Sequence, residues 1–372
     1  MGSKMQAKKV LILGMADGHG GAQTALRELA IVLKHDGLNV AILAIGDKTS
    51  FVPELKSAVL CQIPWSAKST YENVKKAFCV VRAAWLARRF EPDVFVSVGL
   101  ARTANMVSRA LPSSTFKIAQ DFIFGRPADD PLLRSAGRSF DAIGVQAPSM
   151  VAALHASGFS ARPVNWIPCF PKAPIEGCIK QARRTVESIR LGYFGRVVKH
   201  KGLELILEAL ANSEFVVPVT LDIWGSGEDV PRLSKRRGEL GLSKTVSFCG
   251  EYPSGREGAR LMCNYDAIVV PSTGSEGLPL ILIEAMAYGL PFLATDVGAI
   301  CDCCEDNPDA ILVKPHVDAL REGITQLAKK VVDQELSPER LRQYYELHFS
   351  YQVMRRRWQE CLHAPEIFFN AS

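Results

Sequence analysis

The strongest constraint on the fold of this chain is a repeated alternation of short apolar runs with longer stretches of helical spacing. Short runs rich in Val, Ile and Leu, separated by helices, are typical of parallel sheets with helices on both faces. We expect strands at residues 9–14, 40–45, 59–63, 93–98, 116–119, 142–145 and 164–168, and then at 190–194, 220–224, 245–249, 267–270, 291–294 and 310–313. The sequence therefore predicts an α/β protein with two Rossmann-like, doubly wound domains.

Length and a proline-rich stretch divide the chain into two domains. A chain of 372 residues is longer than one hydrophobic core usually serves. Three prolines lie within residues 168–174 and a polar stretch follows them, which is typical of a linker. We therefore expect an N-terminal domain over residues 1–170, a linker over 171–185 and a C-terminal domain over 186–349. Because doubly wound sheets bind ligands at the carboxyl ends of their strands, we expect the two domains to face a cleft.

Composition limits the classes of protein to which the chain can belong. Hydrophobic residues make up 48% and charged residues 22% of the sequence, which is typical of a globular protein. No apolar run approaches the roughly 20 residues that span a bilayer, and the first residues lack the apolar stretch of a signal peptide. The net charge of +5 is mild and indicates no nucleic-acid partner. The ten cysteines lack zinc-type spacing, so we expect no metal site and a cytoplasmic location.

The most informative motif is the run Pro-Ser-Thr-Gly-Ser-Glu-Gly-Leu-Pro that begins at residue 271. It follows an apolar strand and precedes a helix that we expect to begin near Pro279, a favoured position for proline. Gly277 and Leu278 bring the backbone of this turn close to a ligand, and free N–H groups at the helix N-terminus attract anions. Glu276 lies at the mouth of the turn, and Glu284 is the only charge in an otherwise apolar helix that we expect to be buried. Either ribose hydroxyls or a salt bridge within the domain would satisfy such a carboxylate.

A second motif, Gly-Arg-Val-Val-Lys-His-Lys-Gly, begins at Gly195, where another strand is expected to end. Arg196 and Lys201 flank the turn into the next helix. Cations at the carboxyl end of a strand can neutralise a diphosphate, and they stabilise the charge that grows on a phosphate leaving group. The alternative interpretation is that both side chains are solvated surface residues.

These two motifs resemble those of glycosyltransferase family 4, the retaining enzymes of the GT-B fold. The family carries two glutamates separated by seven residues, as Glu276 and Glu284 are, and a Gly-Arg pair followed by Lys-Gly, as at Arg196 and Lys201. The resemblance implies that Glu276 lies by the donor sugar and that Glu284 holds the ribose. It implies that Arg196 and Lys201 hold the diphosphate. It also implies that the last helix, within residues 350–372, packs back on the N-terminal domain.

Further segments fit the same family and add donor-binding residues. A strand leads into a Gly-x-Gly turn at Gly225, and the segment around Glu251 matches the one whose backbone reads the nucleotide base. In the first half, Gly20 and Gly21 match a Gly-Gly-Ala loop that faces the donor phosphates and the acceptor. The alternative in each case is an ordinary turn with nothing bound.

Many members of this family carry a histidine after the fifth strand of the first domain, near the reacting carbon. This chain has Gln120 and Asp121 in that neighbourhood, and the sequence does not decide between them. Asp121 could accept a hydrogen bond from a sugar hydroxyl or deprotonate the acceptor, so we predict it as catalytic beside Glu276, Arg196 and Lys201. It could equally cap the following turn.

A basic helix is expected over residues 69–90 of the first domain. Its cations are Lys75, Lys76, Arg82, Arg88 and Arg89, and its apolar residues include Phe78, Val81 and Trp85. A basic amphipathic helix can lie on anionic lipid, which would make the protein peripheral at the inner face of a membrane. The alternative is a helix that covers its sheet and keeps the cations in water.

The residues and the resemblance together predict a retaining glycosyltransferase that moves a hexosyl group from a UDP- or GDP-sugar to a hydroxyl. The expected acceptor is a saccharide or a lipid-linked molecule, in surface polysaccharide or glycan synthesis. Because no Asp-x-Asp motif stands where a metal would bridge the diphosphate, we expect a metal-independent enzyme without a cofactor. The leaving phosphate would then help to deprotonate the acceptor on the same face of the sugar.

Two other enzyme classes fit parts of the pattern. A nucleotide-sugar epimerase would also bind a UDP-sugar, but it would need no acceptor, and the paired glutamates favour transfer. An NAD-dependent oxidoreductase could use Asp47 to hold a ribose, but Gln23 stands where the dinucleotide fingerprint needs its third glycine. A binding subunit without catalysis remains the third alternative.

Overall fold

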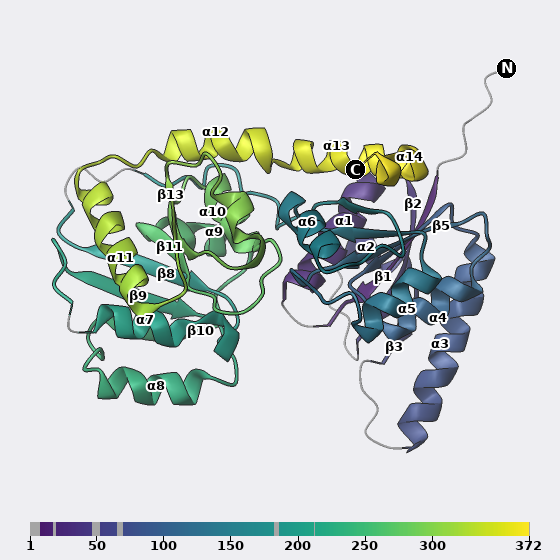
Figure 1. Cartoon of the computed structure of the whole chain (residues 1–372), viewed down its shortest axis with the longest axis horizontal. Helices are drawn as coiled ribbons and strands as arrows, with labels where there is room; N and C mark the ends of the chain where they lie inside the picture. The colour runs from purple at the N-terminus through teal and green to yellow at the C-terminus, as the bar shows by residue number, and fades with distance from the viewer. Residues whose placement is uncertain are drawn as a thin grey trace. The chain divides into compact units, whose positions relative to one another are not determined.

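The computed structural model describes residues 8–17, 20–46, 53–64, 70–181, 186–211 and 213–371. The chain forms two compact units, each built on one parallel sheet (Figure 1). Unit 1 consists of Met1–Lys172 and Met354–Ser372, and unit 2 consists of Ala173–Val353. The predicted fold class, an α/β protein with two doubly wound sheets, is confirmed.

Unit 1 is a sheet of seven parallel strands in the order β3-β2-β1-β4-β5-β6-β7. The strands are β1 (Lys9–Met15), β2 (Asn39–Ile45), β3 (Val59–Ile63), β4 (Val94–Val98), β5 (Phe116–Asp121), β6 (Ala142–Val145) and β7 (Val164–Trp166). The helices are α1 (Gly21–His35), α2 (Pro53–Lys56), α3 (Thr70–Phe90), α4 (Arg102–Ala110), α5 (Pro131–Ser139) and α6 (Pro148–Ala156), joined near the end of the chain by α13 (Tyr351–His363) and α14 (Pro365–Asn370). The strand order reverses between β1 and β4, which makes this pair the switch point of the sheet.

Unit 2 is a sheet of six parallel strands in the order β10-β9-β8-β11-β12-β13. The strands are β8 (Ile189–Phe194), β9 (Val219–Trp224), β10 (Val246–Gly250), β11 (Ala267–Val270), β12 (Phe292–Thr295) and β13 (Ala310–Val313). The helices are α7 (Leu203–Leu210), α8 (Val230–Glu239), α9 (Gly255–Cys263), α10 (Leu280–Ala287), α11 (Val317–Val332) and α12 (Pro338–His348). Here the order reverses between β8 and β11, so the loops that follow these two strands emerge side by side at the switch point.

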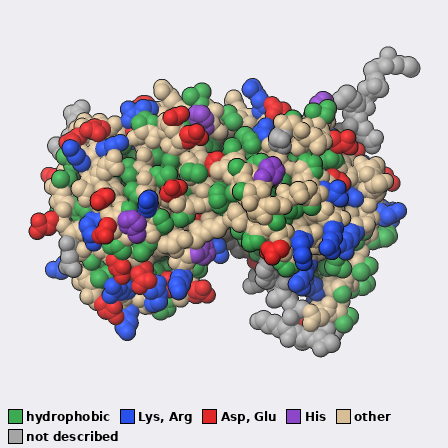
Figure 2. Space-filling model, viewed as in Figure 1, with side chains coloured by type: hydrophobic (Ala, Val, Ile, Leu, Met, Phe, Trp, Pro, Cys, Tyr) green, Lys and Arg blue, Asp and Glu red, His purple; other side chains and the backbone are tan. Residues whose placement is uncertain are grey.

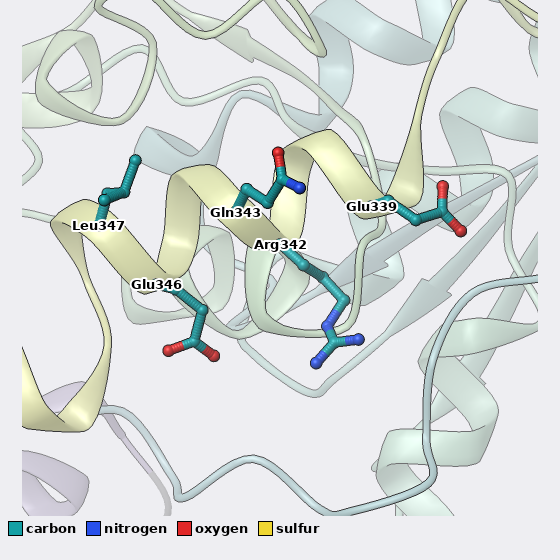
Figure 3. A pocket seen from close by; sticks show the side chains of 5 residues that line it. All are labelled: Glu339, Arg342, Gln343, Glu346 and Leu347. Atoms are coloured by element: carbon teal, nitrogen blue, oxygen red, sulfur yellow. The ribbon is translucent and has the colours of Figure 1, made fainter.

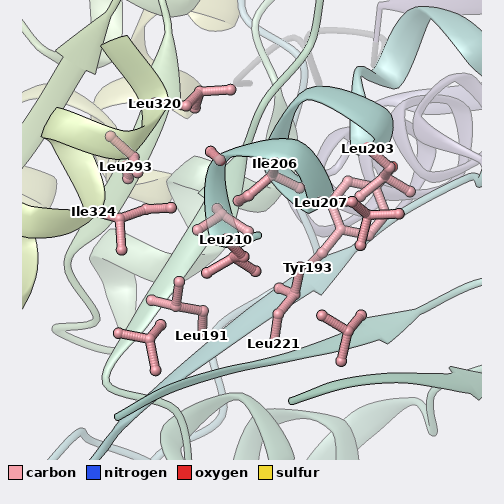
Figure 4. Packing of buried hydrophobic residues seen from close by; sticks show 14 of the residues in the cluster. Leu191, Tyr193, Leu203, Ile206, Leu207, Leu210, Leu221, Leu293, Leu320 and Ile324 are labelled. Atoms are coloured by element: carbon pink, nitrogen blue, oxygen red, sulfur yellow. The ribbon is translucent and has the colours of Figure 1, made fainter. Parts of the chain in front are cut away.

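The core of unit 2 fixes the positions of these strands. Leu191 and Leu221 on the sheet are fully buried beneath Leu207 of α7 and Ile324 of α11 (Figure 4). The strands are apolar on both faces because helices cover both faces of a parallel sheet. The same burial explains why the short apolar runs of the sequence locate the strands so well.

The described part of the predicted linker, 171–185, packs mainly against unit 2. The Lys180 ammonium lies 3.2 Å from the carboxylate of Asp266, a residue that is 4% exposed. The Lys180 backbone N–H donates to the Tyr288 carbonyl at 2.8 Å. The boundary of the compact units therefore falls at residue 172, earlier than the polar stretch suggested, and residues 182–185 lie outside the described part.

The end of the chain packs on unit 1. Trp358 of α13 is 1% exposed, and its indole N–H donates to the Pro168 carbonyl at 2.8 Å. The Arg357 guanidinium lies 4.3 Å from the ring centroid of Trp166 and 4.4 Å from that of Phe368, so it stacks between the two rings. Unit 1 is therefore assembled from the two ends of the sequence.

We predict that Trp358→Ala destabilises unit 1 by about 3–5 kcal/mol, because it removes a fully buried indole and leaves a cavity. Urea unfolding followed by circular dichroism measures this change. Arg356→Ala, at an exposed position of the same helix, is the matched control and should change the free energy of unfolding by less than about 0.5 kcal/mol. A Trp358→Ala protein as stable as the parent would show that docking of Trp358 does not stabilise unit 1.

Candidate functional site

The two sequence motifs of unit 2 meet at its switch point. The loop after β8 contains Arg196 and Lys201, and the loop after β11 contains Glu276. The two loops are tied together because the His200 carbonyl accepts hydrogen bonds from the N–H groups of Thr273, at 2.8 Å, and Gly274, at 3.2 Å. Residues more than 70 positions apart in the sequence are thus neighbours in space.

Glycines permit this close packing of loops. Gly202 has φ of +67°, and a Cβ there would lie 1.8 Å from the Pro271 carbonyl oxygen. Gly225 has φ of +135°, and a Cβ there would lie 1.8 Å from the Gly195 carbonyl oxygen. No side chain fits such gaps, and positive φ is unfavourable for other residues. The predicted residue Gly225 therefore shapes the loop that carries Arg196.

Lys201 and Glu276 form an ion pair at the centre of this arrangement. The Lys201 Nζ lies 2.5 Å from Glu276 Oε1, and the Ser272 hydroxyl donates to the same oxygen at 2.6 Å. Among the described residues both contacts fall on Oε1, and none is made to Oε2. Glu276 is only 9% exposed. Because one charged donor, Lys201, and one neutral donor, Ser272, bind it, its carboxylate is held in one orientation.

The loop after β12 supports the Glu276 turn, a role that the sequence analysis did not assign. The Glu276 carbonyl accepts a hydrogen bond from the Ala299 N–H at 3.0 Å. Gly298 has φ of +63°, and a Cβ there would lie 2.0 Å from the same carbonyl oxygen. The Thr295 hydroxyl donates to the Ser272 carbonyl at 2.6 Å. The signal for this support was a glycine and a hydroxyl residue directly after a strand, but nothing in the sequence shows which loop they contact.

Arg196 extends the positive charge of the site. Its side chain is exposed and makes no ion pair within the described residues, while its carbonyl accepts a hydrogen bond from the Tyr193 hydroxyl at 2.6 Å. Burial, and then the nearby Glu276 carboxylate, raises the pKa of Tyr193, so this hydroxyl stays protonated and keeps donating. Burial and the charges of Lys201 and Arg196 lower the pKa of His200. Two cations thus act on one small region.

Helix α10 begins directly after this turn, with Pro279 as its N-cap residue and Leu278 buried before it. The first N–H groups of the helix have no side-chain cap, so they can face an anion. Glu284 is half-buried one turn further along, less covered than the apolar run suggested. Burial, and then the Glu284 carboxylate, raises the pKa of Tyr252 to about 12.

Glu251 lies at the end of β10 and is exposed. The Ser226 hydroxyl donates to its Oε1 at 3.5 Å, and the Gly225 N–H donates to the Gly250 carbonyl at 2.7 Å. These bonds join the end of β10 to the Gly-x-Gly turn after β9. Apart from Glu284, which lies on α10, the unit 2 residues predicted as donor-binding thus come from loops at the same edge of one parallel sheet.

In unit 1, Gly20 is the N-cap residue of α1 and Gly21 is its first residue. Neither has a positive φ, and a Cβ at Gly21 would meet nothing within 4 Å. The described surroundings therefore do not require glycine at position 21. Gly18 and His19 of the same loop, and Asp47 of the alternative NAD site, lie outside the described residues.

Asp121 is held by a buried ion pair. Its two oxygens accept hydrogen bonds from Arg126 Nε at 2.7 Å and from Arg126 Nη2 at 2.9 Å, and the Ile123 N–H donates to Oδ1 at 3.2 Å. Asp121 is 1% exposed and Arg126 8% exposed. These contacts favour the alternative in which Asp121 organises the turn after β5, because a carboxylate so occupied is poorly placed to accept a proton.

Gln120, one residue earlier, differs from Asp121 in the hydrogen bonding of its side chain. It is 1% exposed, and both polar atoms of its amide are buried without a hydrogen-bond partner among the described residues. A buried amide without hydrogen-bond partners lowers the free energy of unfolding by about 1–3 kcal/mol, so the presence of Gln120 at this position needs an explanation. Of the two residues in the position of the family histidine, Gln120 is the one with unused hydrogen-bonding capacity.

Two other features are separate from these loops. Within the described residues, no group of three or more His, Cys, Asp or Glu side chains could hold a metal ion. A hollow on unit 2 is lined by α12 side chains alone, and it includes none of the predicted site residues (Figure 3). Its described lining consists of Glu339, Arg342, Gln343, Glu346 and Leu347.

Comparison with known structures defines the class of this fold. The structure of Anabaena Alr3699/HepE in complex with UDP and glucose superposes with a TM-score of 0.76 at 18% identity, over 96% of this chain and 100% of that one. The chain therefore has the GT-B fold of glycosyltransferases.

Comparison of sequences shows which family of proteins unit 2 resembles. Residues 179–346 match the family described as Glycosyl transferases group 1, which confirms the resemblance predicted from the motifs. The chain is 29% identical over 166 residues to the D-inositol 3-phosphate glycosyltransferase of Stackebrandtia nassauensis, covering 42% of this chain and 36% of that enzyme. It is 28% identical over 288 residues to an exopolysaccharide phosphotransferase of Streptomyces coelicolor, covering 73% of this chain and 29% of that protein. The chain thus spans about a third of the length of these relatives.

We predict that Asp121→Ala lowers the free energy of unfolding by about 1.5–3 kcal/mol, because it removes two charged hydrogen bonds from the buried Arg126 guanidinium and leaves it with the Asp130 carboxylate at 3.1 Å. Gln120→Leu should be neutral or stabilising, because it replaces an unpartnered amide by an apolar side chain of similar size. Urea unfolding of both variants tests the contrast. A stable Asp121→Ala protein beside a strongly destabilised Gln120→Leu protein would reverse the two assignments.

We also predict that Gly298→Ala disrupts the Glu276 turn, because the added Cβ collides with the Glu276 carbonyl. Gly241→Ala is a matched control: Gly241 also has positive φ, +70°, but a Cβ there meets nothing within 4 Å. The control should lose only about 1–2 kcal/mol of stability, the cost of a left-handed residue. Nucleotide affinity, measured by calorimetry on the folded fraction, should fall only in Gly298→Ala; equal affinity in both variants would contradict the role of Gly298.

Proposed function

We propose that this protein is a glycosyltransferase that takes a sugar from a nucleoside diphosphate bound by unit 2. The observation that carries the proposal is the Lys201–Glu276 ion pair, with Arg196 beside it, at the carboxyl ends of β8 and β11. These residues lie inside the segment that matches the group 1 glycosyltransferases. Cations, a fixed carboxylate and a helix N-terminus together fit a molecule with a diphosphate and several hydroxyls.

Binding of the diphosphate would change the partners of the ion pair. A diphosphate near Arg196 and Lys201 competes with Glu276 for the Lys201 ammonium, since phosphate oxygens are strong acceptors. Glu276 would then be free to accept hydrogen bonds from hydroxyls of the donor sugar, while Ser272 keeps its carboxylate in place. Glu284, one turn into α10, would hold the ribose, and the backbone near Glu251 would contact the base.

Transfer would proceed without a metal and with retention at the anomeric carbon. Negative charge grows on the leaving diphosphate as the glycosidic bond breaks, and Arg196, Lys201 and the N–H groups of α10 would stabilise that charge. The leaving phosphate would accept the proton of the acceptor hydroxyl on the same face of the sugar. The donor is a UDP-sugar in the first instance, because Anabaena Alr3699/HepE was solved with UDP, and a GDP-sugar is the second choice.

The acceptor would be recognised by unit 1. Gln120 offers an amide that can both donate to and accept from hydroxyl groups, which suits a saccharide. Gly20 and Gly21 would allow the backbone to approach the substrate. We also propose that the acceptor is a saccharide or a lipid-linked molecule. The protein would act in surface polysaccharide or glycan synthesis, at a cytoplasmic location peripheral to a membrane.

We predict that calorimetry detects tight binding of one nucleoside diphosphate among UDP, GDP and ADP, unchanged by EDTA. Glu284→Ala and Arg196→Ala should each weaken it by about tenfold or more, because a charged hydrogen bond contributes about 1.5–3 kcal/mol. Glu322→Ala, which removes an exposed glutamate from α11 of the same unit, is the control and should bind as the parent does.

Other outcomes would replace the proposal. Affinity that depends on a divalent metal, or that survives Glu284→Ala, would remove the assignment of phosphate and ribose sites. Binding of NAD in place of these nucleotides would indicate an oxidoreductase. Conversion of a UDP-sugar to its isomer without an acceptor, followed by chromatography, would indicate an epimerase.

A further inference from the structure

Helix α3 exposes a row of large apolar side chains. The exposed fractions are 66% for Val74, 68% for Phe78, 64% for Val81 and 56% for Trp85. Their spacing of four, three and four residues places all four on one stripe along the helix. Of the helices that the structure describes, none is both long and apolar enough to cross a membrane.

The opposite side of α3 already packs on unit 1. Val80, Ala83 and Ala87 are buried, and the helix contacts β3 and α4. A helix that only covered its sheet would carry polar residues on its outer face. Because α3 is apolar on both faces, the outer stripe needs an explanation beyond the fold of unit 1.

Positive charge surrounds the stripe. Helices α3, α4 and α5 together carry nine Lys and Arg residues and one acid, Glu72. On α3, Arg82 and Arg89 border one side of the stripe and Arg88 the other, and the Arg89 guanidinium lies 5.4 Å from the Trp85 ring centroid. In Figure 2, Lys and Arg side chains gather over the part of unit 1 where α4 and α5 lie.

We infer that the outer face of α3 docks on an anionic membrane surface. Apolar side chains of such a helix enter the boundary between headgroups and acyl chains, tryptophan has its preferred place there, and cations on either side meet anionic headgroups. A second copy of this chain fits less well, because pairing this face with itself would bring two sets of cations together. The surface belongs to unit 1 alone, so its role does not depend on the donor site of unit 2.

Co-sedimentation of the full chain with vesicles tests this inference. We expect the protein to pellet with vesicles of phosphatidylcholine mixed with phosphatidylglycerol, to pellet at least tenfold less with phosphatidylcholine alone, and to be released by high salt. Phe78→Ser/Trp85→Ser and, separately, Arg82→Glu/Arg89→Glu should each reduce the bound fraction about tenfold. UDP, GDP and ADP binding measured by calorimetry on the same variants should equal that of the parent, which separates failure of this surface from failure of the proposed function.

Matched substitutions elsewhere provide the controls. Leu347→Ser/Ile367→Ser changes two apolar residues that are 72% and 71% exposed, and Lys314→Glu/Lys329→Glu reverses two exposed charges of unit 2. Both should pellet as the parent does. Absence of binding to anionic vesicles, or equal loss in the α3 variants and the controls, would overturn the inference. So would a dimer, seen by sedimentation velocity, that dissociates in Phe78→Ser/Trp85→Ser, because the stripe would then bind a second copy.

Discussion

The reversal of strand order between β8 and β11 is the constraint on which the candidate site depends. Parallel strands end at the same edge of a sheet, and only at a reversal do two neighbouring strands send their loops in opposite directions around an open space. Lys201 and Glu276 can therefore meet although 74 residues separate them in the sequence. The glycines at 202, 225 and 298 follow from this crowding, since each allows one loop to rest on the backbone of another.

The sequence predicted the fold well because burial on both faces of a parallel sheet leaves short apolar runs that few other structures produce. It also placed Arg196, Lys201 and Glu276 in the loops that follow two of these runs, and the structure brings those loops together. It could not show that Lys201 and Glu276 pair with each other, or that Gly298 and Ala299 support the turn, because these contacts depend on how separate loops cross. The same limit applied to Asp121, whose partner Arg126 is brought back to it by the turn after β5.

The helix 70–90 illustrates a different limit. Its sequence is apolar at positions that fall on opposite sides of the helix, so periodicity alone does not decide which side faces the sheet. The structure buries Ala83 and exposes Trp85. Once the packed face is known, the basic residues can be seen to border an exposed apolar stripe. Charge on a helix is therefore informative once the packed face is known.

Unit 1 is discontinuous in the sequence, because α13 and α14 supply side chains that close its surface around β7. During synthesis, all of unit 2 leaves the ribosome before Trp358 and Phe368 become available to unit 1. The apolar surface of unit 1 that binds Trp358 must therefore stay uncovered until residues 354–371 have been synthesised. Order of synthesis thus separates the two parts of unit 1, because α13 and α14 can dock on it only after the whole of unit 2 has been made.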